Sequence, residues 1–314
     1  MKITTYKKNK YRCLFINVSS ISAKLFEDDV FNKNYKAITY NSEKANRSVF
    51  EYIHKLNIRT IIIENSDVKQ LPGNLTNALI EARINGVRVY EAHTFYEHIN
   101  KRIPLVKFKS DNYLSDNVFA IGLSKLSLKI KRFFDILFCI MLLPLVLPIV
   151  IISGIAVLLT SKGGIFFTQD RVGLNSKIFK IYKLRTMRKE HSGKFTSKDD
   201  FRITSVGKIL RKTKVDELPQ LFNVLKGDMS LIGPRPERPE YVDISNTENA
   251  YFDLRHLVKP GVTGWAQVYL PKATPKDNLK KLEYDLYYIK NYSLLLDLQI
   301  LLKTIKVILT LNSN

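Results

Sequence analysis

"FFDILFCIMLLPLVLPIVIISGIAVLLT", residues 133–160, contains a single charged side chain, Asp135, and this run decides the fold class of the chain. It is long and apolar enough to cross a bilayer as a helix, so the sequence predicts membrane attachment. Pro144 and Pro148 lie in the middle of the run. Each proline removes a backbone donor and collides with the preceding turn, so we expect the helix to bend at these residues.

Basic residues flank the apolar run on both sides. They are Lys125, Lys129, Lys131 and Arg132 before it, and Lys162, Arg171, Lys177, Lys180, Lys183 and Arg185 after it. Because Lys and Arg favour the cytoplasmic side of a membrane helix, both ends are expected on that side. We therefore predict a re-entrant helix that bends at the prolines and returns to the face from which it entered. A straight span and a buried helix of a soluble domain are the alternatives.

The chain as a whole is strongly basic. Its 314 residues include 50 Lys and Arg against 29 Asp and Glu, which gives a net charge of +21. This charge favours anionic partners, namely a membrane surface, phosphorylated small molecules or nucleic acid. No recognised nucleic-acid-binding motif accompanies the charge, so we expect no nucleic-acid partner. Cys13 and Cys139 stand in unlike surroundings, which argues against a disulfide framework and indicates a reducing compartment.

The rest of the chain falls on either side of the apolar run. Residues 1–120 alternate β-rich runs ("CLFINV", "TIIIEN", "VRVYEA") with helical patterns, which predicts a small doubly wound α/β domain. No G-x-G-x-x-G follows the first strand, so we interpret this domain as an accessory module. Residues 121–160 form the linker and the membrane helix, and residues 161–314 form the catalytic domain. Polar residues within 294–311 favour a helix in the membrane interface, with a core helix as the alternative.

The distinctive chemistry lies in "VDELPQLFNVLKGDMSLIGPRPERPEY", residues 215–241. Asp216 and Glu217 stand just before a proline that is expected to begin a helix, and a plain helix cap is the ordinary explanation of such acids. Arg211 precedes them, and Arg235 lies between two prolines that fix its backbone, a setting suited to gripping phosphate oxygens. Two carboxylates that face a diphosphate need a cation between them, for which Mg²⁺ is usual. An ionised Asp can also attack phosphorus as a nucleophile.

Several motifs in the same order strengthen this interpretation. They are "KRFFDILFCIMLLPLVLPI", "FFTQDRVGLNSKIFKIYKLRTM", "DDFRITSVGKILRKTKVDELPQLFNVLKGDMSLIGPRPERPEY", "LRHLVKPGVTGWAQV" and "YDLYYIKNYSLLLDLQILLKTI". Over residues 127–311 the chain resembles the bacterial sugar transferase family, the monotopic polyprenyl-phosphate glycosyl-1-phosphate transferases. The resemblance implies a re-entrant membrane helix, interfacial helices and a small globular active site.

The activity implied by the resemblance is transfer of a sugar-1-phosphate from a UDP-sugar to undecaprenyl phosphate, with release of UMP. Carried onto this sequence, Asp216 is the nucleophile that forms a phosphosugar-enzyme intermediate and Glu217 is its partner. Mg²⁺ is the implied cofactor, held by these two carboxylates. The residues expected to bind phosphate are Arg211, Arg235, Arg171, Lys183 and Arg185.

The resemblance also implies a location at the cytoplasmic face of the bacterial inner membrane, among anionic lipids. There the enzyme would initiate exopolysaccharide, capsule or O-antigen synthesis, with a second copy or polysaccharide-assembly proteins as candidate partners. Two positions depart from the family pattern: Leu147 precedes the bending proline where Ser is common, and Lys214 stands where a small hydroxyl residue is common. The alternative function is a catalytically idle membrane scaffold.

Overall fold

The computed structural model divides the chain into two compact units, residues 1–108 and 109–314. The structure describes residues 10–40, 49–64, 73–105, 124–188 and 200–310.

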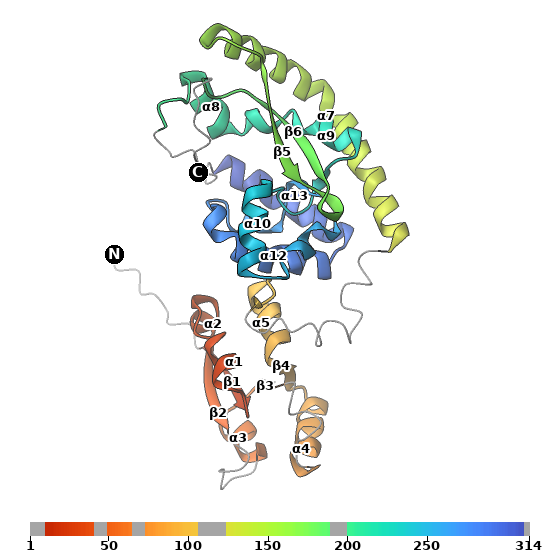
Figure 1. Cartoon of the computed structure of the whole chain (residues 1–314). Helices are drawn as coiled ribbons and strands as arrows, with labels where there is room; N and C mark the ends of the chain where they lie inside the picture. The colour runs from red at the N-terminus through yellow and green to blue at the C-terminus, as the bar shows by residue number, and fades with distance from the viewer. Residues whose placement is uncertain (1–9, 41–48, 65–72, 106–123, 189–199, 311–314) are drawn as a thin grey trace, which may run out of the picture. The chain divides into compact units, whose positions relative to one another are not determined.

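The first unit is a four-stranded parallel sheet with strand order β2-β1-β3-β4 (Figure 1). The strands are β1 (Tyr11–Ile16), β2 (Tyr35–Tyr40), β3 (Thr60–Ile63) and β4 (Arg88–Glu91). The helices are α1 (Ser20–Lys24), α2 (Asp29–Asn34), α3 (Val49–Lys55), α4 (Gly73–Ile84) and α5 (Ala92–Asn100). The predicted small α/β domain is therefore confirmed, although the sequence pattern did not reveal β2.

Side chains that alternate along the central strands pack against helices on both faces of this sheet. On one face Leu14 and Ile61 pack with residues of α3 and α4, and on the other Phe15 and Ile62 pack with residues of α2 and α5. Because both faces are covered, β3 is buried along its whole length, as is typical of strands in a parallel sheet.

The predicted membrane helix is α7 (Lys125–Thr160), which contains both Pro144 and Pro148. It bends along its length (Figure 1), in accordance with the donor that each proline removes from the helical ladder. Within the described residues it is the one helix that is long and apolar enough to cross a membrane. The re-entrant path belongs to the membrane arrangement proposed below.

One face of α7 packs against the rest of the second unit, while its other faces expose large apolar side chains. The buried residues are Asp135, Cys139, Val146, Val150, Gly154 and Val157. Their spacing of three, four and seven residues places them on one helical face. The exposed residues include Met141, Leu145, Ile152 and Leu159, each more than half exposed. A run of exposed apolar side chains along a helix of this length indicates contact with lipid.

Both ends of α7 are held by polar groups of the same unit. Near its start, the Arg132 guanidinium donates to two carbonyls at the end of α9 (Gln220–Lys226), at 2.5 and 2.8 Å. At its end, the Arg185 guanidinium donates to the carbonyls of Ser161 (2.7 Å) and Lys162 (2.9 Å). A single folded body therefore fixes the helix where it begins and where it ends.

The one charge of the apolar run has a structural role. Asp135 is only 5% exposed, and its Oδ1 accepts hydrogen bonds from the Ser230 hydroxyl and the Leu231 amide, both at 3.0 Å. These residues belong to β7 (Ser230–Ile232), which pairs in parallel with β8 (Gly261–Thr263). Asp135 thus fastens α7 to the two-stranded sheet from which the Arg235 loop departs.

The remaining elements complete the second unit. They are the antiparallel hairpin β5 (Phe166–Val172) and β6 (Ile178–Leu184), with α8 (Ser205–Thr213), α10 (Pro239–Glu248), α11 (Trp265–Tyr269), α12 (Asn278–Lys290) and α13 (Leu294–Leu309). Short 3-10 turns are η3 (Leu174–Ser176), η4 (Val215–Glu217), η5 (Phe252–Leu257) and η6 (Pro275–Asp277). Fully buried Leu282, Leu286 and Ile289 place α12 in the core.

The last helix, α13, has two apolar faces with different surroundings. Leu296, Asp297 and Ile300 are buried, and Asp297 pairs with Lys131 of α7 at 2.8 Å. Leu302 and Ile305 are 61% and 55% exposed. The helix is thus docked on the unit by one side, and its other side is available to a membrane surface.

Candidate active site

The two adjacent carboxylates lie in a tight turn between two helices. Lys214 adopts a left-handed conformation (φ 59°) that ends α8, and the 3-10 turn η4 follows with Asp216 and Glu217. Pro219 then precedes α9, so the predicted helix after the acids is confirmed. Both acids line the same cavity.

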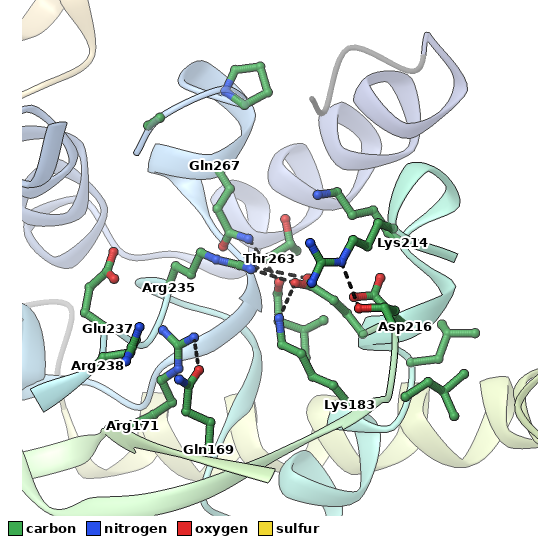
Figure 2. A pocket seen from close by; sticks show the side chains of 18 of the residues that line it. Gln169, Arg171, Lys183, Lys214, Asp216, Arg235, Glu237, Arg238, Thr263 and Gln267 are labelled. Carbon is green, nitrogen blue, oxygen red and sulfur yellow. Dashed lines mark hydrogen bonds and ion pairs between the residues drawn. The ribbon is translucent and has the colours of Figure 1, made fainter. Parts of the chain in front are cut away.

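Glu217 is an ionised anchor for two cations (Figure 2). Its Oε1 lies 2.7 Å from the Lys183 ammonium and 2.6 Å from Arg235 Nη2, and its Oε2 accepts from Arg235 Nη1 at 3.2 Å. Burial raises the pKa of Glu217, but the charges of Arg235 and Lys183 outweigh burial and hold this pKa well below its usual range. Both carboxylate oxygens are therefore committed to protein cations.

The surroundings of Asp216 differ from those of Glu217. Asp216 is 8% exposed, and its Oδ1 has no hydrogen-bond partner among the residues that the structure describes. Burial, followed by the charge of Glu217, raises the pKa of Asp216 to about 6, against the lowering effect of Lys183 and Lys214. At neutral pH the side chain is therefore an ionised carboxylate in the lining of the cavity, near the positive charges of Lys183, Lys214 and Arg211.

The loop that carries Arg235 is fixed through its backbone. The Arg171 guanidinium donates to the Pro236 carbonyl at 3.0 Å, and the buried Arg255 guanidinium donates to the carbonyl of Arg235 itself at 2.9 Å. The next side chain, Glu237, pairs with Lys281 at 2.5 Å. Two guanidinium groups and one ion pair therefore hold the main chain from which Arg235 projects.

The structure brings all five predicted phosphate-binding residues to one cavity of about 1440 Å³, together with both carboxylates. Their guanidinium and ammonium groups are not equally placed. Lys183 and Arg235 face Glu217, while Arg211 donates from Nε to the Thr186 hydroxyl at 2.8 Å. The groups of Arg171 and Arg185 are bonded to backbone carbonyls, so these two residues hold the Arg235 loop and the end of α7.

Sequence reasoning missed several residues that line the same cavity. Glu237, Gln267 and Thr263 lie beside Arg235 in Figure 2, and Arg255, which also lines the cavity, donates to the Arg235 carbonyl. Glu237 stood in the "GPRPERP" segment and Gln267 in "GVTGWAQV", so their neighbourhood was marked. Their contribution to this site depends on the pairing of β7 with β8, which no local sequence pattern predicts.

The carboxylates suit a Mg²⁺ site of one particular kind. Asp216 offers an unpartnered oxygen, whereas both oxygens of Glu217 are held by Lys183 and Arg235. Over the described ranges, no three His, Cys, Asp or Glu side chains gather where a metal could be held. One carboxylate completed by phosphate oxygens and water is a usual environment for Mg²⁺, so the residues fit an ion that arrives with a phosphorylated substrate.

Comparison with known proteins gives a family match over the second unit and relatives of assigned activity. Residues 126–311 match the family described as "Bacterial sugar transferase". The UDP-N-acetylgalactosamine-undecaprenyl-phosphate N-acetylgalactosaminephosphotransferase of Aeromonas hydrophila is 40% identical over 244 residues, covering 76% of this chain and 56% of the relative. The sugar transferase EpsL of Bacillus subtilis, described as uncharacterized, is 42% identical over 181 residues, covering 57% of this chain and 87% of the relative.

A third relative differs in its sugar. The UDP-glucose:undecaprenyl-phosphate glucose-1-phosphate transferase of Klebsiella pneumoniae is 40% identical over 194 residues, covering 60% of this chain and 42% of the relative. This chain thus spans about half the length of the Aeromonas and Klebsiella proteins.

Proposed function

We propose, from the premise that this chain belongs to the bacterial sugar transferase family, that it moves a sugar-1-phosphate from a UDP-sugar to undecaprenyl phosphate and releases UMP. The observation that carries the proposal is that two adjacent acids, Asp216 and Glu217, have different hydrogen-bond partners. Glu217 is neutralised by Lys183 and Arg235, while Asp216 lines the same cavity and its buried Oδ1 has no hydrogen-bond partner among the described residues. An anchored cation pair beside a free carboxylate suits binding of a diphosphate next to a nucleophile.

In the first step, an Asp216 carboxylate oxygen attacks the phosphorus that carries the sugar. A new oxygen–phosphorus bond forms, the bond from that phosphorus to the bridging oxygen breaks, and UMP departs with the electron pair. The enzyme is left with a phosphosugar on Asp216. This attack requires an ionised carboxylate. The pKa of Asp216 is about 6, so the side chain is in that form above about pH 6.

In the second step, a phosphate oxygen of undecaprenyl phosphate attacks the same phosphorus. The bond to Asp216 breaks, the carboxylate is restored, and a lipid-linked sugar diphosphate is released. Arg235 and Lys183 would stabilise the negative charge that develops on the phosphoryl oxygens, and Glu217 holds both cations in place before substrate arrives. Mg²⁺, when bound to Asp216 and phosphate oxygens, would neutralise further charge on the diphosphate.

The membrane arrangement that we propose is re-entrant, on the cytoplasmic face of the inner membrane. It is supported by Arg132 and Arg185, which fasten the two ends of α7 to one folded unit, and by the exposed apolar faces of α7 and α13. A straight span would carry the end of α7 to the far side of the bilayer, away from the unit that binds it. The basic residues around both helix ends suit anionic lipid headgroups.

The donor sugar is proposed only by class. The Aeromonas relative is named for N-acetylgalactosamine and the Klebsiella relative for glucose, so a UDP-hexose or UDP-N-acetylhexosamine is the donor to test first. Its product would start exopolysaccharide, capsule or O-antigen assembly. A catalytically idle scaffold is the second candidate, and the ionisable, unpartnered Asp216 oxygen speaks against it because a scaffold has no use for one.

The test is mass spectrometry of the protein after incubation with a panel of UDP-sugars and Mg²⁺, without undecaprenyl phosphate. A sugar-phosphate adduct should appear on the peptide that contains Asp216, with up to one UMP released per enzyme. Asp216→Asn should lose both, and Asp243→Asn, on an exposed carboxylate of α10, should lose neither. An adduct on another residue would disprove the nucleophile, and release of no UMP from any donor would favour the scaffold.

A further inference from the structure

The cavity beside Asp216 is larger and more apolar than a nucleotide-sugar site needs. Its volume of about 1440 Å³ exceeds the roughly 300–1,000 Å³ of ordinary small-molecule pockets. Part of its lining comes from Phe166 and Phe167 of β5 and from Leu301, Val307 and Ile308 of α13. These side chains offer no hydrogen bond or charge to a sugar hydroxyl, a diphosphate or a nucleobase edge.

The α13 part of this lining begins next to the phosphate-binding end. Leu301, Thr304 and Ile308 are three and four residues apart and therefore share one face of the helix. The Thr304 hydroxyl bonds the Thr263 hydroxyl at 2.6 Å, and the Thr263 carbonyl accepts from the Gly233 amide at 2.9 Å, two residues before Arg235. Figure 2 shows Thr263 beside Arg235 in the cavity.

The same helix continues the apolar lining to the outside of the molecule. Next to the cavity face, Leu302, Ile305 and Leu309 are 61%, 55% and 77% exposed. An apolar path therefore leads from a group of phosphate-suited cations to a helix face that we have assigned to the membrane.

A ligand that matches both ends must carry a phosphate at one end and a long apolar chain at the other. We infer that the C-terminal half of α13, through Leu301, Val307 and Ile308, is the wall along which the isoprenoid chain of the lipid acceptor lies. This inference rests on the proposed function, which supplies undecaprenyl phosphate as the acceptor. The nucleotide sugar is polar throughout and leaves this wall free, so donor and acceptor contact different parts of one cavity.

The experiment compares Val307→Asn with Ile305→Asn, which makes the same kind of change on the exposed face of the same helix. Assays in detergent micelles remove differences in membrane attachment. Val307→Asn should raise the KM for undecaprenyl phosphate by roughly tenfold or more, since loss of a single apolar contact has effects of this size. The UMP burst from the UDP-sugar and the KM of that donor should stay unchanged. Val307→Leu should restore the acceptor KM, and the Ile305 variant should resemble the wild type.

Chain length gives a second readout. The preference of the enzyme for undecaprenyl phosphate over geranyl phosphate should fall in Val307→Asn and persist in Ile305→Asn. An unchanged acceptor KM, an equal effect in both variants, or an effect confined to the UDP-sugar would overturn the inference. A wild-type protein that releases no UMP from any donor would instead overturn the proposed function, and the inference with it.

Discussion

Arg235 faces Glu217 with both ends of its guanidinium group, Nη2 to Oε1 at 2.6 Å and Nη1 to Oε2 at 3.2 Å. Lys183 contacts the same carboxylate at 2.7 Å. The buried Oδ1 of Asp216, the preceding residue, has no hydrogen-bond partner in the described ranges. Two acids that are neighbours in sequence therefore have different surroundings: one holds two cations, and the other is the residue that we propose as the nucleophile.

Replacement of Arg235 by Lys should expose the importance of the two-point contact. A lysine keeps the charge but cannot grip two oxygens at once. We expect the kcat/KM for the UDP-sugar to fall by roughly 10²–10³-fold, the range seen when one stabilising donor is removed from an active site. The measurement is the initial rate of UMP release. Arg83→Lys, on the exposed surface of α4, is the control, and a comparable loss there or full activity in Arg235→Lys would contradict this role.

The pH dependence of the first step should report Asp216. Burial and the charge of Glu217 raise its pKa from the ordinary 3.8 to about 6, so kcat/KM for the UDP-sugar should decline as pH falls below about 6. Removal of a neighbouring charge should move this decline in a predictable direction. Lys214 lowers the pKa of Asp216, so Lys214→Gln should shift the decline to higher pH. Glu217→Gln should shift it to lower pH in whatever activity is left. Shifts in the reverse directions would refute the assignment.

The same ionisation has the opposite effect on stability. The folded protein retains the Asp216 proton up to about pH 6, whereas the unfolded chain releases it near its ordinary pKa of 3.8. The stabilisation from this proton is therefore present below about pH 4 and is lost as pH rises toward 6. Relative to the wild type, Asp216→Asn should gain stability over that interval, as measured by denaturant unfolding in detergent.

How far the sequence could predict this site is clearest at Arg185 and Glu217. Local patterns located the acids, the prolines around Arg235 and the basic residues of the hairpin, because charge and backbone restriction are visible in short segments. They could not show that the Arg185 guanidinium turns to the end of α7, or that Lys183 and Arg235 meet on Glu217. Those facts depend on residues 18 to 34 positions apart coming together, which only tertiary packing decides.

The same distinction applies to the fold. The apolar run and the β-rich segments were recognisable by composition, whereas β2, "YKAITY", carries three exposed residues and has no continuous apolar pattern. Asp135 was visible as the one charge of the membrane helix. That it binds β7, and so joins α7 to the catalytic unit, required the structure.

Two replacements of Asp135 should show how much its hydrogen bonds, as distinct from the space its side chain fills, contribute to stability. Asp135→Leu leaves the buried Leu231 amide without this acceptor, at a cost of about 1–3 kcal/mol, whereas the Ser230 hydroxyl still has the Ile232 carbonyl as an acceptor at 2.9 Å. Asp135→Asn retains one oxygen acceptor and should cost less. Thermal unfolding in detergent measures both. Equal stability of the Leu variant and the wild type would mean that the helix is held by its apolar stripe alone.

The proposed re-entrant path of α7 leads to a topology prediction that uses two new cysteines. Leu126 is 67% exposed near the start of the helix, and Lys162 is exposed just after its end. Native Cys13 and Cys139 are fully buried, so the wild-type protein should remain unlabelled and is the control. In spheroplasts, Leu126→Cys and Lys162→Cys should both resist a membrane-impermeant thiol reagent, and both should react after the membrane is permeabilised.

The reason is that Arg132 and Arg185 bind the two ends of α7 to one unit, so that both ends must lie on the side of the membrane where that unit folds. Reaction of just one cysteine in spheroplasts would show a straight span and would place the bonds to Arg185 in doubt. Pro148→Ala should give a mixture of the two topologies. It restores a backbone donor and removes the cost of roughly 3 kcal/mol that a proline imposes on a continuous helix. If the bend keeps the two ends together, this variant should partly expose the cysteine at position 162 and lose activity in proportion.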